Sequence, residues 1–179
     1  MPATLKRRST SRRTKSGNGR SSRKGKDAIA LLKEDHQMVR KMLKRLASNG
    51  TEDLLNQIEA ELKIHTQIEE EIFYPAFRDS LRSQKDEHLY YEALEEHHVV
   101  DMVLPEIKES SEGSAEFEAK AKVLKDIVEH HAEEEEKQMF PKARKLMGAA
   151  ELRELGEQLQ ERKQELMGDM GMRMRRRAA

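Results

Sequence analysis

The chain has 179 residues, with 34 basic and 34 acidic side chains and no cysteine. This length allows one domain with a substantial core, and the lack of cysteine excludes disulfides, thiolate metal sites and thiol catalysis. No apolar run approaches the length of a membrane span, and the basic N-terminus lacks the apolar segment of a secretory signal. We therefore expect a soluble, cytoplasmic protein that does not bind a membrane.

The balanced charge hides a separation along the chain. Residues 1–26 hold ten basic and no acidic residues, and residues 170–179 hold four basic and no acidic residues. With those 14 subtracted from the 34, residues 27–169 hold 20 basic against 34 acidic side chains, a formal charge of −14. An acidic body with basic ends excludes a basic nucleic-acid-binding domain, although the ends themselves suit contact with a polyanion.

Residues 1–26 are rich in Ser, Gly, Arg and Lys, and they contain one leucine and no aromatic residue. Such a segment buries too little apolar surface to offset its chain entropy, so we predict a disordered, solubilising tail. The alternative is a weak, sequence-independent contact with nucleic acid or another polyanion. The acidic body of this protein or of a neighbour is a further partner for such a tail.

Apolar residues recur at helical spacing through most of the remaining chain, with few β-branched residues and no strand-like alternation. The turn-forming segments SNGT (48–51) and SSEGS (110–114), together with Gly148, separate the periodic stretches. Pro75 is expected to bend the second helix or to loosen its last turns, and Pro141 occupies the matching place in the fourth. The predicted helices span about 27–47, 52–81, 85–108, 115–147 and 149–167.

Four long helices with short connections predict an all-α fold, an antiparallel up-down four-helix bundle. The predicted domain spans residues 27–147 and follows the disordered basic tail of residues 1–26. Residues 148–179 are predicted to form an appended C-terminal helix and a basic tail rich in Met and Arg. The methionines near the C-terminus suit a soft-metal site, but the arginines between them favour a frayed basic tail instead.

Two segments carry the same pattern of His, Glu, aromatic residue and Pro. They are ELKIHTQIEEEIFYP, residues 61–75, and IVEHHAEEEEKQMFP, residues 127–141. Each has a His ten residues before its proline and a Glu six residues before it, which gives the pairs His65–Glu69 and His131–Glu135. A spacing of four places both side chains of a pair on one face of a helix.

Both pairs fall in the middle of an apolar stripe when each helix is traced at 100° per residue. His130 and Glu134, by contrast, fall well to one side of it. The stripes are formed by Leu54, Leu55, Ile58, Leu62 and Ile72 in the earlier helix, and by Leu124, Ile127, Val128 and Met139 in the later one. A carboxylate in a core is costly unless it is paired or bound to a metal, so the repetition indicates a functional site.

The other two bundle helices supply one His each. KEDHQMV around His36 aligns with LEEHHVV around His97, because each has an acidic pair before the His and a Val three residues after it. A lone core His is more often hydrogen-bonded than metal-bound, but matched residues in two repeated halves favour a metal site. The candidate metal-binding residues are His36, His65, Glu69, His97, His131 and Glu135.

The neighbouring polar and aromatic residues are interpreted as structural. His98 and His130 are expected on the surface, and His88 is expected at the start of the third helix. Apart from the two candidate ligands, the glutamate runs 69–71 and 133–136 are interpreted as solvated faces. The aromatic residues that we expect to cap the site, rather than to act as redox relays, are Phe73, Tyr74, Phe77 and Phe140.

The order and spacing of these residues resemble the hemerythrin family, in particular its HHE cation-binding branch, over about residues 27–147. The ferritin-like pattern instead has a Glu followed by a His three residues later, whereas here the His leads and the Glu follows at four. The matching elements are His36, HTQIE (65–69) with FYP, EEH (95–97), and HAEEE (131–135) with MFP.

The resemblance implies a centre of two non-haem iron ions inside the bundle. Imidazole and carboxylate groups are good ligands for iron, and shared carboxylates offset much of the cationic charge. In that arrangement the ligands divide into His36 with His65, His97 with His131, and Glu69 and Glu135 as bridges. Oxygen-transport hemerythrins carry a further His one turn before the third-helix ligand, where this chain has Ala93. The resemblance therefore implies more open coordination positions than a simple oxygen carrier has.

The resemblance also implies a protein that binds or reacts with dioxygen, nitric oxide or peroxide, as a sensor, a scavenger or a stress-response protein. Its partner would be a small diatomic ligand, either dioxygen or nitric oxide. The alternatives are an iron store or donor for the repair of iron centres, and a bundle that holds structural zinc. The sequence leaves open whether the protein is an enzyme and which oligomer it forms.

Overall fold

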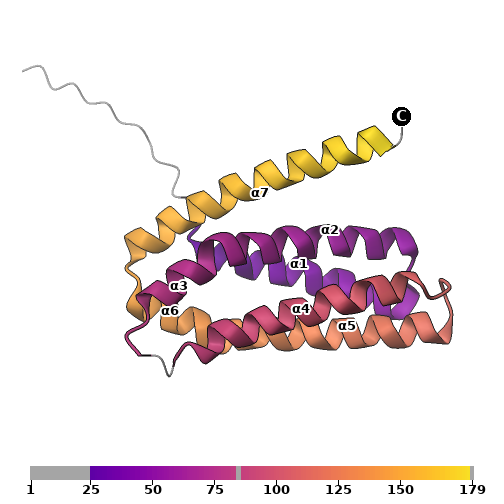
Figure 1. Cartoon of the computed structure of the whole chain (residues 1–179), viewed down its shortest axis with the longest axis horizontal. Coiled ribbons are helices and arrows are strands. Elements are labelled where there is room, and N and C mark those ends of the chain that lie inside the picture. The colour runs from indigo at the N-terminus through magenta and orange to yellow at the C-terminus, as the bar shows by residue number, and fades with distance from the viewer. Residues whose placement is uncertain (1–24, 84–85, 178–179) are drawn as a thin grey trace, which may run out of the picture.

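The structure is a computed structural model that describes residues 25–83 and 86–177, and the regular elements in these ranges are all helices (Figure 1). The basic tail predicted for residues 1–26 lies almost wholly outside the described residues. In chain order the elements are α1 (Ala28–Asn49), α2 (Glu52–Ile68), η1 (Glu69–Phe73), α3 (Tyr74–Ser80), α4 (His88–Lys108), α5 (Ala115–Glu134), η3 (Glu135–Met139), α6 (Phe140–Leu146) and α7 (Ala149–Arg177).

Side-chain caps set the starts of three long helices. The Asp27 carboxylate accepts a hydrogen bond from the backbone N–H of Ala30 at 2.8 Å, and α1 begins there. The Thr51 hydroxyl accepts one from the N–H of Leu54 at 3.2 Å, and Ser114 caps α5 in the same way. These caps satisfy backbone donors that a first helical turn leaves unpaired, so the predicted turns before α2 and α5 define where those helices begin.

The second and fourth bundle helices each contain one wide π-helical turn, η1 and η3, which ends two residues before a proline. Pro75 and Pro141 have no N–H, and in a regular helix each ring would clash with the carbonyl four residues back. The preceding turn widens instead. The Tyr74 N–H donates to the Glu69 carbonyl five residues earlier, and the Phe140 N–H donates to the Glu135 carbonyl in the same way.

The expected irregularity at Pro75 takes the form of this wide turn, and α3 leaves the line of α2 in Figure 1. The helix continues past the proline as α3, and the irregular turn lies before it rather than after it. In both halves the π-helical turn begins at the Glu of the repeated His–Glu pair. A wide turn of this kind is frequent at functional sites because it shifts the direction in which a side chain points.

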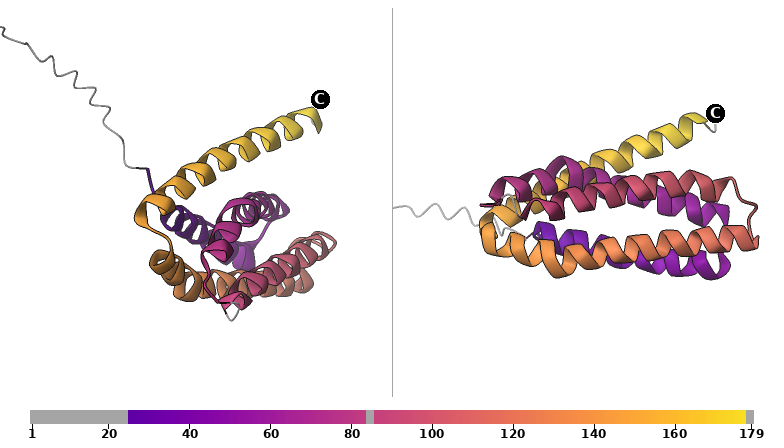
Figure 2. Two further views of the ribbon diagram at one scale, coloured as in Figure 1. Left: turned by 60° about the vertical axis from the view of Figure 1, so that its left-hand side comes forward. Right: turned by 60° about the horizontal axis from the view of Figure 1, so that its bottom comes forward.

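Four long helical rods lie side by side and form the predicted antiparallel bundle (Figures 1 and 2). They are α1, α2 with η1 and α3, α4, and α5 with η3 and α6. Around the bundle, α1 packs against α2 and α5, and α4 packs against α2 and α5. The appended helix α7 packs across α1, α2 and η1. The face formed by α1 and α2 is therefore covered by a fifth helix, whereas the face formed by α4 and α5 has no such cover in the described part of the chain.

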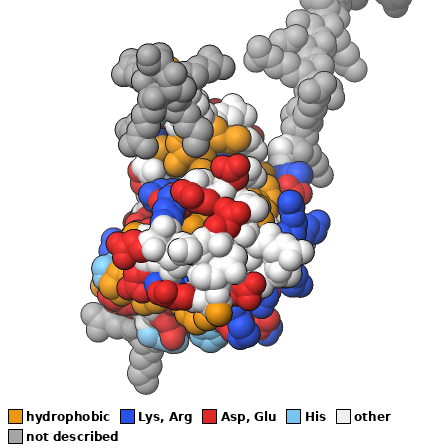
Figure 3. Space-filling model, turned by 90° about the vertical axis from the view of Figure 1, so that its right-hand side faces the viewer, with side chains coloured by type: hydrophobic (Ala, Val, Ile, Leu, Met, Phe, Trp, Pro, Cys, Tyr) orange, Lys and Arg blue, Asp and Glu red, His pale blue; other side chains and the backbone are white. Residues whose placement is uncertain are grey.

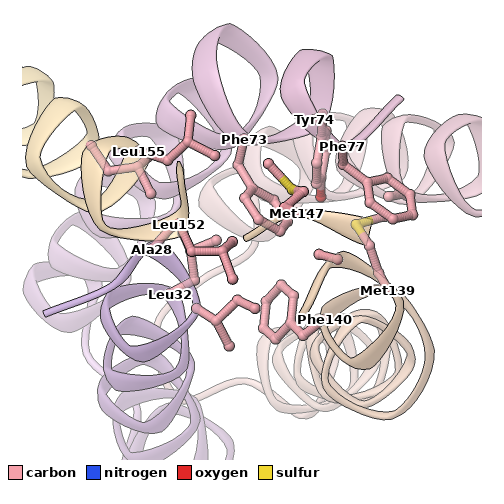
Figure 4. Packing of buried hydrophobic residues seen from close by; sticks show 14 of the residues in the cluster. Ala28, Leu32, Phe73, Tyr74, Phe77, Met139, Phe140, Met147, Leu152 and Leu155 are labelled. Atoms are coloured by element: carbon pink, nitrogen blue, oxygen red, sulfur yellow. The ribbon is translucent and has the colours of Figure 1, made fainter. Parts of the chain in front are cut away.

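The apolar core is divided into two clusters by the layer that holds the candidate site. One cluster contains Leu43, Leu55 and Leu104 among others, and lies on one side of the four histidines along the helices. The other contains the aromatic residues beside the prolines and extends to α7. Figure 4 shows part of this second cluster, including Phe73 and Phe140 together with residues of α7. Close packing on both sides fixes the helices that carry the site.

Helix α7 joins this core through Leu152, Leu155 and Leu159, all of which are buried. It comes close to the start of α1 at Gly156, where an added Cβ would lie 2.4 Å from the carbonyl oxygen of Lys26. Only glycine allows this approach. The later part of α7 leans away from the bundle in the views of Figures 1 and 2, and the helix extends to Arg177 rather than fraying after Met167 as predicted.

The substitution Gly156→Ala is expected to lower stability, because its methyl group would push α7 off the start of α1. Overpacking of this kind costs about 1–3 kcal/mol, which corresponds to a fall in Tm of roughly 3–10 °C for a chain of this size. Gly168→Ala is the matched control in the same helix, since an added Cβ there meets nothing within 4 Å. Thermal unfolding followed by circular dichroism should show a lower Tm for the first variant alone. Equal Tm values would contradict the close approach.

The surface of the bundle carries charges of both signs. On the end shown in Figure 3, acidic and basic side chains are interspersed rather than gathered into a patch of one sign. No helix in the described ranges combines the length and the apolar character needed to cross a membrane.

Candidate metal centre

The six side chains singled out from the sequence converge between the two apolar clusters. Each is at most 5% exposed, and among the described residues they make up the buried polar or charged set. Every bundle rod contributes: α1 and α4 give one His each, and α2–η1 and α5–η3 give one His and one Glu each. The residues are His36, His65, Glu69, His97, His131 and Glu135.

Their donor atoms form two overlapping groups that share a carboxylate. The first group is His36, His65, Glu69 and Glu135, and the second is Glu69, His97 and His131, with all atoms of a group within 4.8 Å of one another. Glu69 Oε2 lies 3.3 Å from His65 Nε2 and 3.5 Å from His97 Nε2. His65 belongs to the first half of the chain and His97 to the second, so Glu69 contacts both groups of donor atoms.

Glu135 repeats this arrangement from the other half. Its Oε2 lies 3.1 Å from His36 Nε2 and 3.7 Å from His131 Nε2. The Nε2 atoms of His97 and His131 are 3.2 Å apart. Each carboxylate is therefore placed between histidines of both halves, which is the position that a group shared by two cations requires.

Several of these buried atoms accept or donate no hydrogen bond. His36 Nε2 and Glu135 Oε2, for example, lie 3.1 Å apart without a hydrogen bond between them. Buried polar atoms in folded proteins are nearly always bonded, and an unpaired one costs about 1–3 kcal/mol. The unpaired atoms are Nε2 of His36, both ring nitrogens of His65, and both carboxylate oxygens of Glu69 and of Glu135. Lone pairs of imidazole and carboxylate that face one space fit a bound cation.

A second carboxylate stands behind each histidine. His36 Nδ1 lies 3.0 Å from Glu136 Oε1, and His97 Nδ1 lies 2.8 Å from Glu70 Oε1. Glu136 and Glu70 each directly follow the Glu of a repeated pair, so these two contacts are equivalent and cross from one half to the other. A carboxylate at Nδ1 fixes the orientation of a ring whose Nε2 faces a metal.

The outer carboxylates of the other two histidines belong to the acidic residues that directly precede His97 and His36 in sequence. His131 Nδ1 lies 2.8 Å from Glu96 Oε2, and His65 Nδ1 lies 3.7 Å from Asp35 Oδ2. The side chain of Asp35 also accepts a hydrogen bond from Lys163 of α7 at 2.6 Å. The sequence reasoning missed this outer ring. Its signal was present in the acidic pairs KED and LEE and in the glutamate runs, which we had interpreted as solvated.

The comparisons with known proteins agree with this geometry. Residues 27–143 match the family described as hemerythrin HHE cation binding domain. The chain belongs to this family. The resemblance inferred from the motif spacing is thereby confirmed, and so is the hemerythrin-like helical fold with its additional C-terminal helix.

A crystal structure of a hemerythrin HHE cation binding domain-containing protein from Mycobacterium kansasii, a homologue of Rv2633c, has a TM-score of 0.72 and 27% identity to this chain. It covers 84% of this chain, and the match spans 93% of that one. The uncharacterized protein Rv2633c of Mycobacterium tuberculosis is 26% identical over 148 residues, which are 79% of this chain and 88% of that protein.

A further relative is a protein of Nostoc sp. named DNA nickase. It is 28% identical over 114 residues, which are 62% of this chain. The match covers 31% of the Nostoc protein, so it is confined to about a third of that longer relative.

The charges of this HHE domain explain why its site suits a cation. Burial, together with the nearby charge of Glu135, raises the pKa of the Glu69 carboxyl well above its ordinary value. Burial also favours a neutral Glu135, but the charge of His131 and the close contact with His36 outweigh it and lower the pKa of Glu135 to about 2. The pKa values of the two carboxyls are thus shifted in opposite directions, and a bound cation would favour the ionised form of both.

Two histidines of the site also differ from ordinary imidazoles. For His36 the contacts with Glu135 and Glu136 outweigh burial and raise its pKa to about 9. His65 has the opposite shift, because burial dominates and lowers its pKa to about 4. A neutral His65 keeps a lone pair available to a metal at neutral pH, whereas His36 must lose a proton when it binds one.

The residues before the two prolines stack on the site. The Tyr74 ring stacks on His97 with centroids 5.5 Å apart, and the Phe140 ring stacks on His36 at 5.8 Å. Both are buried caps, as expected. Tyr74 differs from a purely apolar cap, because its hydroxyl lies 3.3 Å from His97 Nε2. Burial among the carboxylates raises the pKa of that phenol well above its ordinary value.

Two small cavities adjoin the histidines. One has a volume of about 20 Å³, and the four histidines and apolar side chains such as Val39 and Val100 line it. The other, of about 10 Å³, lies beside Ala93, which is buried one turn before His97. His98 and His130 lie at the surface as predicted, and His88 is the exposed first residue of α4.

Proposed function

We propose that this HHE domain holds two non-haem iron ions and that it binds or reacts with dioxygen, nitric oxide or peroxide as a sensor, scavenger or stress-response protein. The observation that carries the proposal is the set of buried, unpaired donor atoms contributed by both halves of the chain. In a fold without a cation these atoms would be a net cost, and in a fold with two cations they would be ligands.

The proposed ligands divide as the distances between them suggest. One ion would be held by His36 and His65 and the other by His97 and His131, with Glu69 and Glu135 shared. Bound iron supplies redox chemistry and coordination positions for a small molecule. The chain contributes the rest: the carboxylates behind the rings orient the imidazoles, and the two apolar clusters keep bulk water away. Imidazole and carboxylate without thiolate suit iron, and two groups of donor atoms that share Glu69 suit two ions better than one.

The proposed reaction partner is a small molecule because of the space beside the histidines. A cavity of about 20 Å³ holds one molecule about the size of water. Most of its remaining lining is apolar, which suits a neutral diatomic ligand better than a charged metabolite. This cavity supports dioxygen or nitric oxide over a larger organic substrate.

The absence of a histidine at position 93 is proposed to leave the centre more reactive. Ala93→His would place an imidazole on the same face of α4 as His97, one turn away. The variant is expected to slow the oxidation of the reduced, iron-loaded protein by air several-fold, because a further ligand occupies an open position. The rate is measured by absorption after mixing reduced protein with air. A variant that still binds two irons but oxidises at an unchanged or faster rate would count against this role of Ala93.

The experiment that tests the proposed function combines metal analysis with an absorption spectrum. Protein purified after growth in iron should contain two irons per chain, and its bands should change on exposure to air and, separately, to nitric oxide. Iron that passes to an apo acceptor without such bands would instead support a store or donor. A colourless protein that contains zinc would contradict the iron centre altogether.

A further inference from the structure

The two halves of the site are equivalent, but their surroundings differ in one respect. Aligning the histidines of the two halves places Leu32 opposite Ala93, Ile64 opposite His130 and Ile68 opposite Glu134. The three first-half residues are buried on the side of the bundle where α7 packs. Their second-half counterparts are a methyl group, an exposed imidazole and a partly exposed carboxylate.

These second-half residues form a cluster of cation ligands with Glu96. Donor atoms of Glu96, His130 and Glu134 all lie within 4.8 Å of one another. Glu96 joins this cluster to the buried centre. Its Oε1 lies 3.6 Å from the ring of His130 at the surface, and its Oε2 lies 2.8 Å from the ring of His131 inside.

An acidic groove leads to this cluster from outside. It lies between α4 and α5 and has a volume of about 550 Å³. None of the described residues that line it is Lys or Arg, although Asp126 at one part of it pairs with both Lys122 and Lys125. The lining consists of Glu92, Glu95, Glu96, Asp126 and His130 with Val99, Val123 and Ile127. A groove lined by carboxylates raises the local concentration of cations and the rate at which they arrive.

A small cavity continues inward from the cluster. Its lining includes the partly exposed Glu96 and Glu134, the buried His131 and Glu135, and Ala93. Glu135 is 2% exposed, and its two carboxylate oxygens have no hydrogen-bond partner. An unpaired buried carboxylate therefore faces the same cavity as the surface cluster. A larger residue at position 93, such as the Leu32 of the first half, would fill this space.

We propose that Glu96, His130 and Glu134 form a transient divalent-cation site through which metal reaches the buried centre, past Ala93 to Glu135. This inference rests on the proposed function, since it requires that the centre binds metal. One imidazole and two carboxylates at the surface bind a divalent ion weakly enough to release it. The first half has apolar residues at the equivalent positions, so loading takes place from the α4–α5 face.

The loading rate of the full chain tests this route, with Co²⁺ as the probe because it is stable in air and its visible absorption reports its ligands. The double variant His130→Ala/Glu134→Gln is expected to load about tenfold more slowly than the wild type, since it loses both the ligands and a focusing charge. It should still bind two ions at equilibrium. The matched control is His98→Ala/Glu133→Gln, which makes the same two changes at exposed positions, one on α4 and one on α5.

The control is expected to load at the wild-type rate. Equal rates for the double variant and the control, with two ions bound in each, would overturn the route while leaving the proposed function intact. A wild-type protein that takes up no Co²⁺ at the buried site, or one ion only, would overturn the proposed centre and the route with it.

A second variant tests the inner part of the route without touching a proposed ligand. Ala93→Leu should slow loading about tenfold or more, because its side chain fills the cavity between the surface cluster and Glu135. Its circular dichroism spectrum and final metal content show whether the fold and the centre remain. A folded Ala93→Leu protein that loads as fast as the wild type would overturn the passage past position 93.

Discussion

The variant His131→Ala is expected to lose bound metal, whereas His130→Ala is expected to retain two ions per chain at equilibrium. The two residues are adjacent in sequence, but His131 is 5% exposed within the proposed centre and the side chain of His130 is 65% exposed. Removing a ligand from a buried site should weaken metal binding by more than about 100-fold, since changes behind a ligand already cost 10–100-fold. Removing the surface imidazole changes only how fast metal arrives.

The measurement is the metal content per chain after prolonged dialysis against a weak chelator. His131→Ala should retain at most one ion, and His130→Ala should match the wild type. Similar metal loss in both variants would show that the face of α5 that points to the centre has been assigned wrongly.

Replacing the two shared carboxylates by amides is expected to change the stability of the metal-free protein in opposite directions. Glu69 has a raised pKa, so the metal-free fold gives up stability as the pH rises above its ordinary value of 4.5. Glu69→Gln removes that loss and should stabilise the metal-free protein by about 1–2 kcal/mol at pH 7. The gain should shrink as the pH falls toward 4.5.

Glu135→Gln is the matched control at the equivalent position. The pKa of Glu135 is lowered to about 2, so its ionised form stabilises the fold above its ordinary value of 4.5. Its loss should therefore destabilise the metal-free protein at pH 7. Both variants should lose the increase in Tm that metal gives the wild type, because each lacks a shared ligand. Thermal unfolding with and without metal measures both effects. A lower metal-free Tm for Glu69→Gln would contradict the assigned burial cost.

The sequence was sufficient to predict the bundle and the candidate ligands because the chain contains the pattern twice. A single His–Glu pair at a spacing of four is common. Two pairs, His65–Glu69 and His131–Glu135, at the same distances from a following proline are not expected from helical spacing alone. The aligned positions of His36 and His97 completed the set. The structure brings these six side chains together, and their role as metal ligands stays a prediction.

The π-helical turns at Glu69 and Glu135 were not predicted. They result from a balance between the proline ring and the packing of the helix on both sides of it, and that balance is not visible in the spacing of apolar residues. The outer carboxylates were missed for a related reason. Glu70 lies about 100° around the helix from Glu69, so it looks solvated until the neighbouring helix brings His97 to it.

The extent of α7 also differs from the prediction. Its apolar periodicity ends near Met167, yet the helix continues to Arg177 despite Gly168 and Gly171, which disfavour helical backbone. The contact between α7 and the candidate metal centre was not predicted from the sequence either. Lys163 reaches Asp35, and Asp35 faces His65, so the appended helix supports the first half of the site.

The most direct test of the two-iron centre is a crystal of the iron-loaded protein measured at the iron absorption edge. The anomalous difference map should show two peaks within the bundle. One should lie against His36 and His65, the other against His97 and His131, and Glu69 and Glu135 should contact both. A single peak among the six side chains, or none there, would contradict a centre of two ions.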